Sequence, residues 1–562
     1  MLTASRPFAL FLAVPLFLAA AAHAQSVDLN AADAVDTQVE TQTETPQTAD
    51  EAGQAAAAAE TAGEAADTTP TQTAPSKQRT AAKPQPRRAP QGVLIRDVVY
   101  SGPSSYLSES ELAKIEAGLV GRRYSNAGLA LIPQAINQAY AEKGIVTAQA
   151  ILRSVAGGRA EVELLEARIG AVRASGGLVS DDYARFRLQL PAGTLADNRV
   201  ISTRVEQLAL TENLPLDIGY APGQAYGTTD LTVAFPPQKR HFTSVTVDNY
   251  GSASSGEAQM TIAHTVRSLT GWNDPLSLSV LLRKGATGGT ISYARTITPS
   301  GGFISLVGAY TKSKSITGPN IRGEQKSLDM AFTQPLVVER AYRTSLGFGL
   351  TAFAETSSLL GVQTLNHRGT ELSLNASYYR AGEGWSVTYA PRAIFGTYDD
   401  AVTPRANISY AAAQVNLFAS VALGADAVGS VTASGQKRGW GVLPSQRKFT
   451  VTSPAGVRGY PTNLSSGDSG YYARTQVEKL TPYAISGDFG LRPFAFYDMG
   501  EAYDSTDTGL GFASSVGIGA SFGVGNTAFG DVYVAKPLTT GITGWAAPSR
   551  APVFGASVSI TF

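Results

Sequence analysis

The residues whose types and spacing could do covalent chemistry lie in one segment, Gly467-Asp468-Ser469-Gly470. Such a glycine-flanked serine becomes nucleophilic only beside a general base that a carboxylate orients, and no histidine motif accompanies it. The chain has four histidines, one of them His23 in the leader, and no cysteine. Thiol catalysis, disulfides and cysteine-ligated metals are therefore excluded. We expect no enzyme activity, no metal and no cofactor, and we interpret residues 467–470 as a loop.

Charge and motif content exclude two further classes of function. Lys+Arg and Asp+Glu number 45 each, so there is no basic excess that would indicate a nucleic-acid partner. The sequence has neither a P-loop nor a glycine-rich dinucleotide fingerprint after a predicted strand. Charged residues make up 16% of the 562 residues, below the usual share of about 25%, while glycine is abundant at 57. This composition indicates extended β-structure with small side chains.

The first 24 residues have the pattern of a secretory signal peptide. Arg6 precedes an apolar run that ends at Ala22-His23-Ala24, a small-x-small cleavage site. A membrane anchor is the alternative, but the run is short and contains Pro15. We expect an exported protein.

Residues 25–92 are predicted to be a disordered, low-complexity linker. The segment lacks aromatic residues up to position 91, and its acidic residues precede its basic ones. It cannot bury enough apolar surface to offset its ordering entropy. The alternative is that residues 49–66, rich in Ala and Glu, form a helix that plugs a pore.

Two similar α+β modules follow in tandem, at residues 93–168 and 169–238, each with the order β-α-α-β-β. In the first, Ser108 and Glu111 form a capping box at a helix start, and Gly144 follows the second helix as a C-cap residue. Two strands, 146–153 and 160–166, are predicted to flank Gly157-Gly158.

Residues 239–562 alternate apolar and small polar side chains with period two. The clearest case runs from Leu510 to Val524, longer than the usual soluble strand of about 5–6 residues. Such strands match tilted membrane strands of about 9–11 residues with extensions. Because an open sheet edge in lipid leaves unpaired amides, the sheet must close. We predict an all-β transmembrane barrel of about sixteen antiparallel strands, ending at Phe562 in a terminal aromatic that resembles the assembly signal of bacterial outer-membrane barrels.

Residues 93–562 resemble the two-partner secretion transporters of Gram-negative outer membranes (TpsB type; haemolysin activation/secretion proteins of the ShlB/FhaC/HecB family). In this family the tandem modules are POTRA domains. The resemblance is carried by residues 136–148 and 164–170 of the first module, a first-strand motif, a pore-loop tetrad and a wall motif. The last three are Asp248, Asn249 and Gly251; Val457, Arg458, Gly459 and Tyr460; and Phe496, Asp498 and Gly500.

The resemblance implies that Arg458, on a loop folded back into the pore, pairs with Asp498 on the inner wall. A guanidinium facing a carboxylate can make two parallel charge-assisted hydrogen bonds, which would fix the tip of such a loop. Period-two alternation then turns Phe496 and Asp498 inward and Tyr497 toward lipid.

The implied function is secretion of an unfolded TpsA-type exoprotein, without ATP, from the periplasm through the barrel. The POTRA modules would bind the client by adding one of its strands to a sheet edge. The expected edge residues are Val146, Ala148, Ala150, Leu231 and Val233. The other expected partners are the barrel assembly machinery during biogenesis and outer-membrane lipids, with no nucleic acid.

Three rival functions remain open at this point. An insertase of the same superfamily would build other barrels into the membrane, and two modules instead of a longer POTRA string favour the exporter. A passive porin or solute receptor is less consistent with paired periplasmic modules. The third rival is a structural surface protein without transport.

Overall fold

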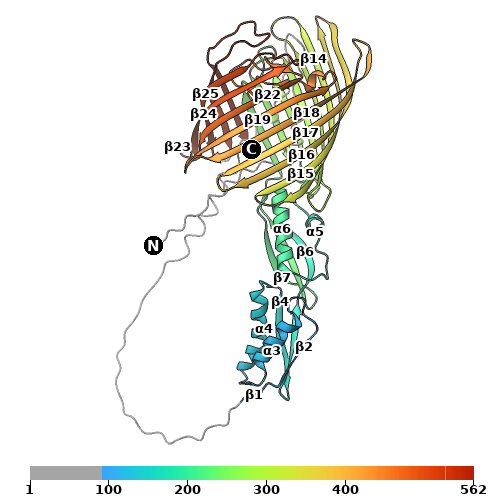
Figure 1. Ribbon diagram of the computed structural model, residues 1–562, viewed down its shortest axis with the longest axis vertical. Coiled ribbons are helices and arrows are strands. Elements are labelled where there is room, and N and C mark those ends of the chain that lie inside the picture. The colour runs from blue at the N-terminus through green and yellow to red at the C-terminus, as the bar shows by residue number, and fades with distance from the viewer. Residues whose placement is uncertain (1–91, 526) are drawn as a thin grey trace, which may run out of the picture.

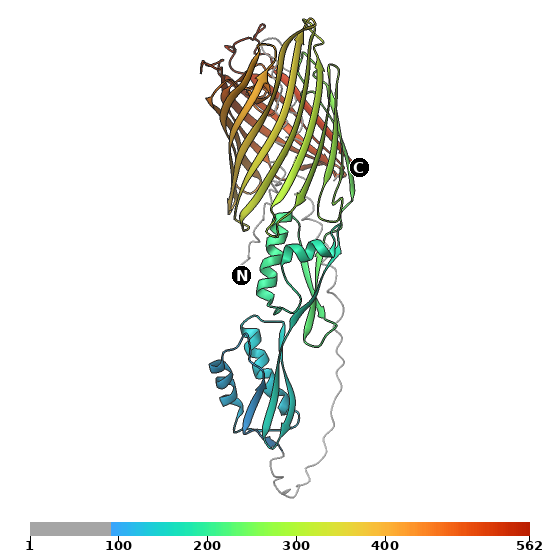
Figure 2. The ribbon, with the colours of Figure 1, turned by 90° about the vertical axis from the view of Figure 1, so that its right-hand side faces the viewer.

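The computed structural model describes residues 92–525 and 527–562. The predicted signal peptide, nearly all of the linker and the possible plug helix at 49–66 lie outside the described residues. Two small α/β modules and a barrel are stacked in chain order along one axis (Figures 1 and 2). The second module lies between the first module and one end of the barrel.

The first module packs two helices on a small sheet. A capping box starts its first helix, since the Ser108 side chain accepts from the Glu111 N–H and the Glu111 carboxylate accepts from the Ser108 N–H. The sheet order is β2-β5-β4, which leaves β4 at an edge. The elements are β1 (Val93–Leu94), β2 (Asp97–Ser101), α3 (Glu109–Leu119), β3 (Arg123–Tyr124), η1 (Gly128–Ala130), α4 (Leu131–Glu142), β4 (Ala148–Ala156) and β5 (Arg159–Glu166).

The second module repeats this plan with the sheet order β6-β8-β7. Its elements are β6 (Arg168–Gly176), α5 (Asp181–Leu188), α6 (Asn198–Glu212), β7 (Asp217–Pro222) and β8 (Thr228–Phe235). Asp197 and Ser180 cap the two helices through their side chains.

The topology corrects part of the expected client-binding edge. Leu231 and Val233 lie on β8, which is the central strand because it pairs in parallel with β6 and antiparallel with β7. Both side chains are fully buried in the module core. Val146 is also not on an edge strand, because β4 begins at Ala148 and the Val146 N–H lies against Asn198 of the second module at 3.3 Å.

A closed antiparallel barrel of sixteen strands follows in the described part of the chain. β27 pairs with β9 to close it. β23 (Tyr483–Ser486) pairs with β24 beyond the end of β22, so β22 and β23 together fill one position in the wall. The other strands are β9 (His241–Asp248), β10 (Gln259–Val266), β11 (Leu276–Arg283), β12 (Ala286–Thr296), β13 (Phe303–Lys314), β14 (Ile321–Val338), β15 (Tyr342–Leu359), β16 (Val362–Gly382), β17 (Trp385–Asp400), β18 (Arg405–Ala422), β19 (Ala427–Trp440), β22 (Ser469–Lys479), β24 (Phe489–Tyr503), β25 (Ala513–Val524), β26 (Ala528–Pro537) and β27 (Val553–Thr561).

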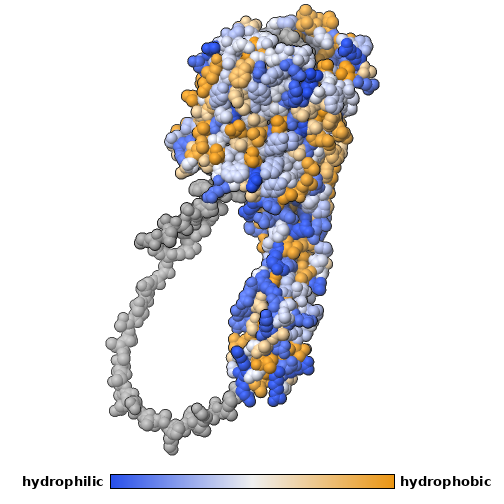
Figure 3. Space-filling model, in the orientation of Figure 1, coloured by the Kyte–Doolittle hydropathy of each residue, from blue (hydrophilic) through white to orange (hydrophobic). Residues whose placement is uncertain are grey.

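The two faces of the wall differ as the alternation predicts. Leu350 is 52% exposed on the outside, whereas its neighbour Thr351 is 5% exposed on the inside. Figure 3 shows apolar side chains spread over the outer wall and hydrophilic ones frequent on the two modules. The alternating segment is shorter than predicted, because β25 begins at Ala513 and Leu510 packs in a loop cluster inside the barrel instead.

The Gly467–Gly470 segment is not the loop that we expected. Its first residue ends β21 (Ser466–Gly467), and Ser469 begins β22. The Ser469 hydroxyl accepts a hydrogen bond from the Arg438 N–H at 3.0 Å. Separately, no helix among the described residues is long and apolar enough to cross a membrane.

Candidate functional site

The connection between β19 and β22, residues 441–468, folds back into the barrel, and we call it the pore loop. It contains a short helical turn, η2 (Ser445–Arg447), and a small hairpin in which β20 (Phe449–Thr450) pairs with β21. The Val457 N–H donates to the Val451 carbonyl at 2.8 Å, which tightens the tip of this hairpin. The tip is therefore an ordered structure and carries the predicted tetrad.

Arg458 at the tip binds Asp498 on β24 in a bidentate arrangement. Nε lies 2.7 Å from Oδ2 and Nη2 lies 3.0 Å from Oδ1, and the Arg458 backbone N–H lies 3.2 Å from Oδ2. Both side chains are buried, at 3% and 0% exposure. Because an unpaired buried charge costs several kcal/mol, this pair strongly favours one position of the tip.

Aromatic rings of the inner wall complete the seat of the guanidinium. Its central carbon lies 3.4 Å from the ring centroid of Phe496 and 5.6 Å from that of Tyr533, within cation–π range. Nη1 also reaches Oε1 of Gln476 at 3.3 Å. Phe496 and Asp498 face inward, while Tyr497 between them is 39% exposed on the outside.

The other three tetrad residues fix the tip by different means. Val457 is fully buried in an apolar cluster, and the Tyr460 hydroxyl donates to the Ser514 carbonyl at 2.6 Å. Gly459 has φ +87°, and a Cβ there would lie 3.0 Å from that of Ala535. Glycine is thus required at 459 by both backbone conformation and space.

The first-strand motif lies at the seam where β9 meets β27. The Asn249 side-chain amide donates to the Phe554 carbonyl at 2.8 Å, and its side-chain oxygen accepts from the Ala556 N–H at 2.9 Å. The Asn249 side chain thus makes hydrogen bonds to β27 of the kind that strand backbones make with each other. Asp248 accepts from the Tyr250 N–H at 2.8 Å. A Cβ on Gly251 would lie 2.2 Å from the Gly256 carbonyl oxygen.

Tyr250 connects this seam to the pore loop. Its hydroxyl donates to Asp531 at 2.7 Å, its ring stacks on Tyr533 and its carbonyl accepts from Thr462 of the loop at 3.4 Å. At the other end of the β9–β27 pairing, the Phe562 N–H donates to the Thr243 carbonyl at 2.9 Å.

Comparison with known proteins agrees with this geometry. The model of the family described as haemolysin secretion/activation protein ShlB/FhaC/HecB matches residues 227–524, more than half of the chain. The chain belongs to this family. The heme/hemopexin transporter protein HuxB of Haemophilus influenzae (strain 86-028NP) is 23% identical over 487 residues, covering 77% of this chain and 81% of HuxB. The outer membrane transporter CdiB of Escherichia coli is 26% identical over 190 residues, covering 33% of this chain and 31% of CdiB.

Solved structures share the fold. CdiB from Escherichia coli superposes with a TM-score of 0.60 at 18% identity, covering 85% of this chain and 93% of that one. BamA from Haemophilus ducreyi lacking POTRA domains 1–3 gives a TM-score of 0.53 at 12% identity, covering 84% and 100%. As a ShlB/FhaC/HecB family member, the chain is an outer-membrane transporter with periplasmic POTRA modules, and members of this family are transporters rather than enzymes.

Two residues of the site had no signal in the sequence. Gln476 on β22 and Tyr533 on β26 contact Arg458, and neither lies in a short motif. Tyr250 lies within the predicted first-strand motif, but its contact with the pore loop was not predicted. The predicted POTRA edge residues lie far along the chain from the pore loop, and no contact joins the two groups in the described residues. Among those residues, no three His, Asp or Glu side chains are grouped to hold a metal ion.

Proposed function

We propose that this transporter secretes one unfolded exoprotein of the TpsA class from the periplasm to the cell exterior through its barrel. The observation that carries the proposal is the ordered pore loop, whose tip is held to the inner wall by the buried Arg458–Asp498 pair. A loop seated in this way occupies the lumen, and its displacement would give a passage to an extended chain.

The client would be captured by strand addition to an edge of a POTRA sheet, where main-chain hydrogen bonds give affinity and alternating pockets give selectivity. Each sheet has two edge strands, β2 and β4 in the first module and β6 and β7 in the second. The candidates for this role are β4, which carries the predicted Ala148 and Ala150, and β7, because each pairs antiparallel with one neighbour only and β7 is largely exposed.

The energy for export would come from the client itself. Folding of the client outside the cell would prevent its return and bias its diffusion outward, so the transporter would need no ATP. During its own biogenesis, the barrel would be inserted into outer-membrane lipid by the barrel assembly machinery, with Phe562 in the terminal recognition signal.

A second candidate function is assembly of other outer-membrane barrels. The similarity in fold to BamA favours testing it. The two candidates differ in what is lost when the protein is absent, since an exporter serves one client and an insertase serves many barrels.

The test of the exporter is the substitution Arg458→Ala. We expect the barrel to insert and to show a normal heat-dependent shift on gels, while the amount of the dependent extracellular protein falls to below about a tenth. Arg343→Met is the matched control, because Arg343 also lies on a barrel strand and is partly buried, but its contacts are the Glu339 carbonyl and the Tyr379 ring, outside the pore loop. Unchanged export by the Arg458→Ala transporter would contradict the assigned role.

A further inference from the structure

The pore loop has a second buried ion pair at its base, in η2. We propose that Arg447 is a positioning residue that holds the base of the pore loop against β16, so that two separate anchors keep the loop across the lumen. This inference rests on the proposed function for its purpose, but its geometry and its test do not depend on an exoprotein.

Arg447 binds Glu371 of β16 in a bidentate arrangement. Nε donates to Oε1 at 2.7 Å, and Nη2 donates to the other carboxylate oxygen. The Tyr410 hydroxyl, on β18, donates to the same carboxylate. The two charged side chains are 4% and 1% exposed, as deeply buried as the pair at the tip.

Neighbouring loop residues are bound to the same part of the wall. The backbone N–H groups of Ser445 and Gln446 donate to the two carboxylate oxygens of Glu355, on β15, at 3.1 and 3.3 Å. Nδ1 of His367 lies 2.7 Å from Oε1 of Glu355 and helps to orient it. Gln325 of β14 donates to the Gln446 side chain at 3.0 Å, so three strands of the wall bind this turn.

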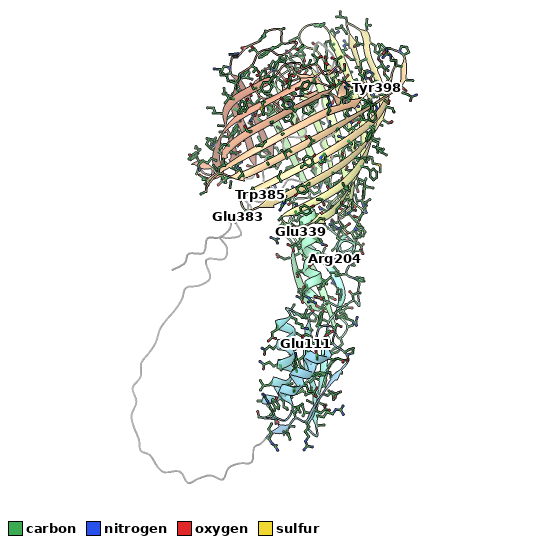
Figure 4. The ribbon with its side chains drawn as sticks, viewed as in Figure 1. Glu111, Arg204, Glu339, Glu383, Trp385 and Tyr398 are labelled. Atoms are coloured by element: carbon green, nitrogen blue, oxygen red, sulfur yellow. The ribbon has the colours of Figure 1, made fainter. Side chains whose placement is uncertain are left out.

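Apolar packing supports the polar contacts at the base. Leu443 is 2% exposed and belongs to a cluster with five residues that project inward from β15, β17 and β18. Tyr398, one member of this cluster, lies toward the end of the barrel that is remote from the POTRA modules, whereas Trp385 lies near the modules (Figure 4). The cluster is formed by Phe353, Ile394, Tyr398, Tyr410, Ala412 and Leu443.

The two anchors lie on different parts of the wall. In the barrel order, β17, β18, β19 and β22 separate β16, which carries Glu371, from β24, which carries Asp498. The loop leaves β19, contacts β14–β16 through its base and then contacts β22, β24 and β26 through its tip. It therefore spans the lumen, and release of the tip alone leaves the base attached.

This arrangement gives each anchor a separate effect on the pore. Breaking one buried pair leaves a desolvated charge without its partner, which favours a loop position in which water reaches that charge. Loss of the base anchor should then open the lumen even when Arg458 and Asp498 are intact. A loop held by its tip alone would not respond to a change at Arg447.

The experiment measures single-channel currents of the full-length protein in planar bilayers without any client. In Arg447→Met we expect the fraction of time in open states to rise at least about tenfold, which corresponds to about 1.4 kcal/mol of lost anchoring. Arg447→Lys keeps the charge but not the bidentate geometry and should give an intermediate rise. Arg343→Met should behave as the unchanged protein, and Arg458→Ala should show its own rise.

An open fraction in Arg447→Met equal to that of Arg343→Met, with a raised fraction in Arg458→Ala, would overturn the inference. Should Arg447→Met fail to assemble, Glu371→Gln removes the same ion pair with a side chain of similar shape and carries the same expectation. Because no exoprotein is present, this result is independent of whether the proposed export is correct. Conversely, export that does not depend on this protein would contradict the proposed function and leave the two-anchor geometry standing.

Discussion

The two joints along the axis of the molecule differ in how deeply their contacts are buried. At the joint between the second POTRA module and the barrel, a buried ion pair of the module hydrogen-bonds to the barrel, and aromatic rings of the two bodies lie in contact. The joint between the two POTRA modules has several exposed polar contacts, and Leu195 of the second module packs against the core of the first. Exposed pairs contribute about 0–1 kcal/mol, whereas disrupting a buried pair costs about 3–5 kcal/mol. We therefore expect the second module to be fixed to the barrel and the first to pivot on the second.

At the barrel joint, α5 and α6 contact periplasmic turns of the barrel. Arg187 of α5 and Glu212 of α6 form a buried ion pair within the second module. From this pair, Arg187 donates to the Pro299 carbonyl of the barrel at 3.1 Å, and Glu212 accepts from the Asn273 amide of the barrel. The ring of Trp272, in a barrel turn, lies 5.2 Å from that of Phe186 on α5, and Arg295, also of the barrel, places its guanidinium 4.7 Å from the Trp272 centroid. The Arg187–Pro299 and Phe186–Trp272 contacts join the two bodies.

At the joint between the modules, one residue, Ala167, connects β5 to β6. The Asn198 amide donates to the Gly144 carbonyl at 2.8 Å, and the Tyr226 hydroxyl donates to Glu163 at 2.9 Å. Tyr226 is 68% exposed. Each of these hydrogen bonds competes with water, so we expect them to oppose rotation of the first module relative to the second only weakly.

The largest effect is expected from Arg187→Met, which removes the hydrogen bond to Pro299 of the barrel and leaves Glu212, on α6 of the same module, buried without its ionic partner. We predict a loss of about 3–5 kcal/mol in the stability of this end of the second module, and with it a loss of docking to the barrel. Because the chain has no cysteine, spin labels can be placed at Arg204→Cys on α6 and Glu383→Cys at the near rim of the barrel (Figure 4). Their distance distribution should be narrow in the otherwise unchanged protein and broad in Arg187→Met. A distribution that stays narrow would show that the ion pair does not hold this joint.

A smaller effect is expected from Trp272→Ala at the same joint. The substitution removes the ring contacts with Tyr183 and Phe186 and the cation–π contact with Arg295. With about 0.5–1.5 kcal/mol for each aromatic pair, we predict a loss of about 1–3 kcal/mol. The same pair of labels should report a broadening smaller than that of Arg187→Met. Equal or larger broadening would mean that the aromatic contacts of Trp272, and not Arg187, contribute most to holding the second module against the barrel.

Asn198→Ala tests the joint between the modules. It removes one hydrogen bond to Gly144 and one from the Val146 N–H, each worth about 1 kcal/mol. Labels at Lys114→Cys and Arg204→Cys should already give a broad distribution, which widens slightly in this variant. A narrow distribution in the otherwise unchanged protein would contradict the proposed pivot.

The smallest effect is expected from acidification, which should destabilise the first module, since the hydrogen-bond partners of Glu166 all lie in that module. Burial acts to raise the pKa of Glu166, but hydrogen bonds from Ser104, the Ser105 backbone and Tyr140 outweigh burial and lower it. Because the folded-state pKa lies below the usual 4.5, this stabilisation is complete above pH 4.5 and is lost as the pH falls through the folded-state pKa. The free energy of local opening of α4, which carries Tyr140, should fall less between pH 7 and 3 in Glu166→Gln than in the unchanged protein, as measured by hydrogen exchange of the full-length protein. An equal fall in both would contradict this role of Glu166.

The sequence allowed much of the fold and the tip anchor to be predicted, because both depend on local patterns. Period-two alternation indicates strand faces whatever the partner strand, and the tetrad and wall motifs are short. The position of β8 was predicted wrongly because its alternation of buried and half-buried side chains indicates a core-facing strand but not how many neighbours it has, and only its pairing with both β6 and β7 makes it central. The base anchor was missed because Arg447 and Glu371 are far apart in the chain and neither lies in a motif.

The most direct test of the proposed function compares the extracellular and outer-membrane proteomes of cells with and without this gene. The account predicts the loss of one large extracellular protein, with other outer-membrane barrels unchanged and the loss reversed by the wild-type gene but not by Arg458→Ala. A broad fall in many outer-membrane barrels would instead identify an insertase and contradict the proposed function.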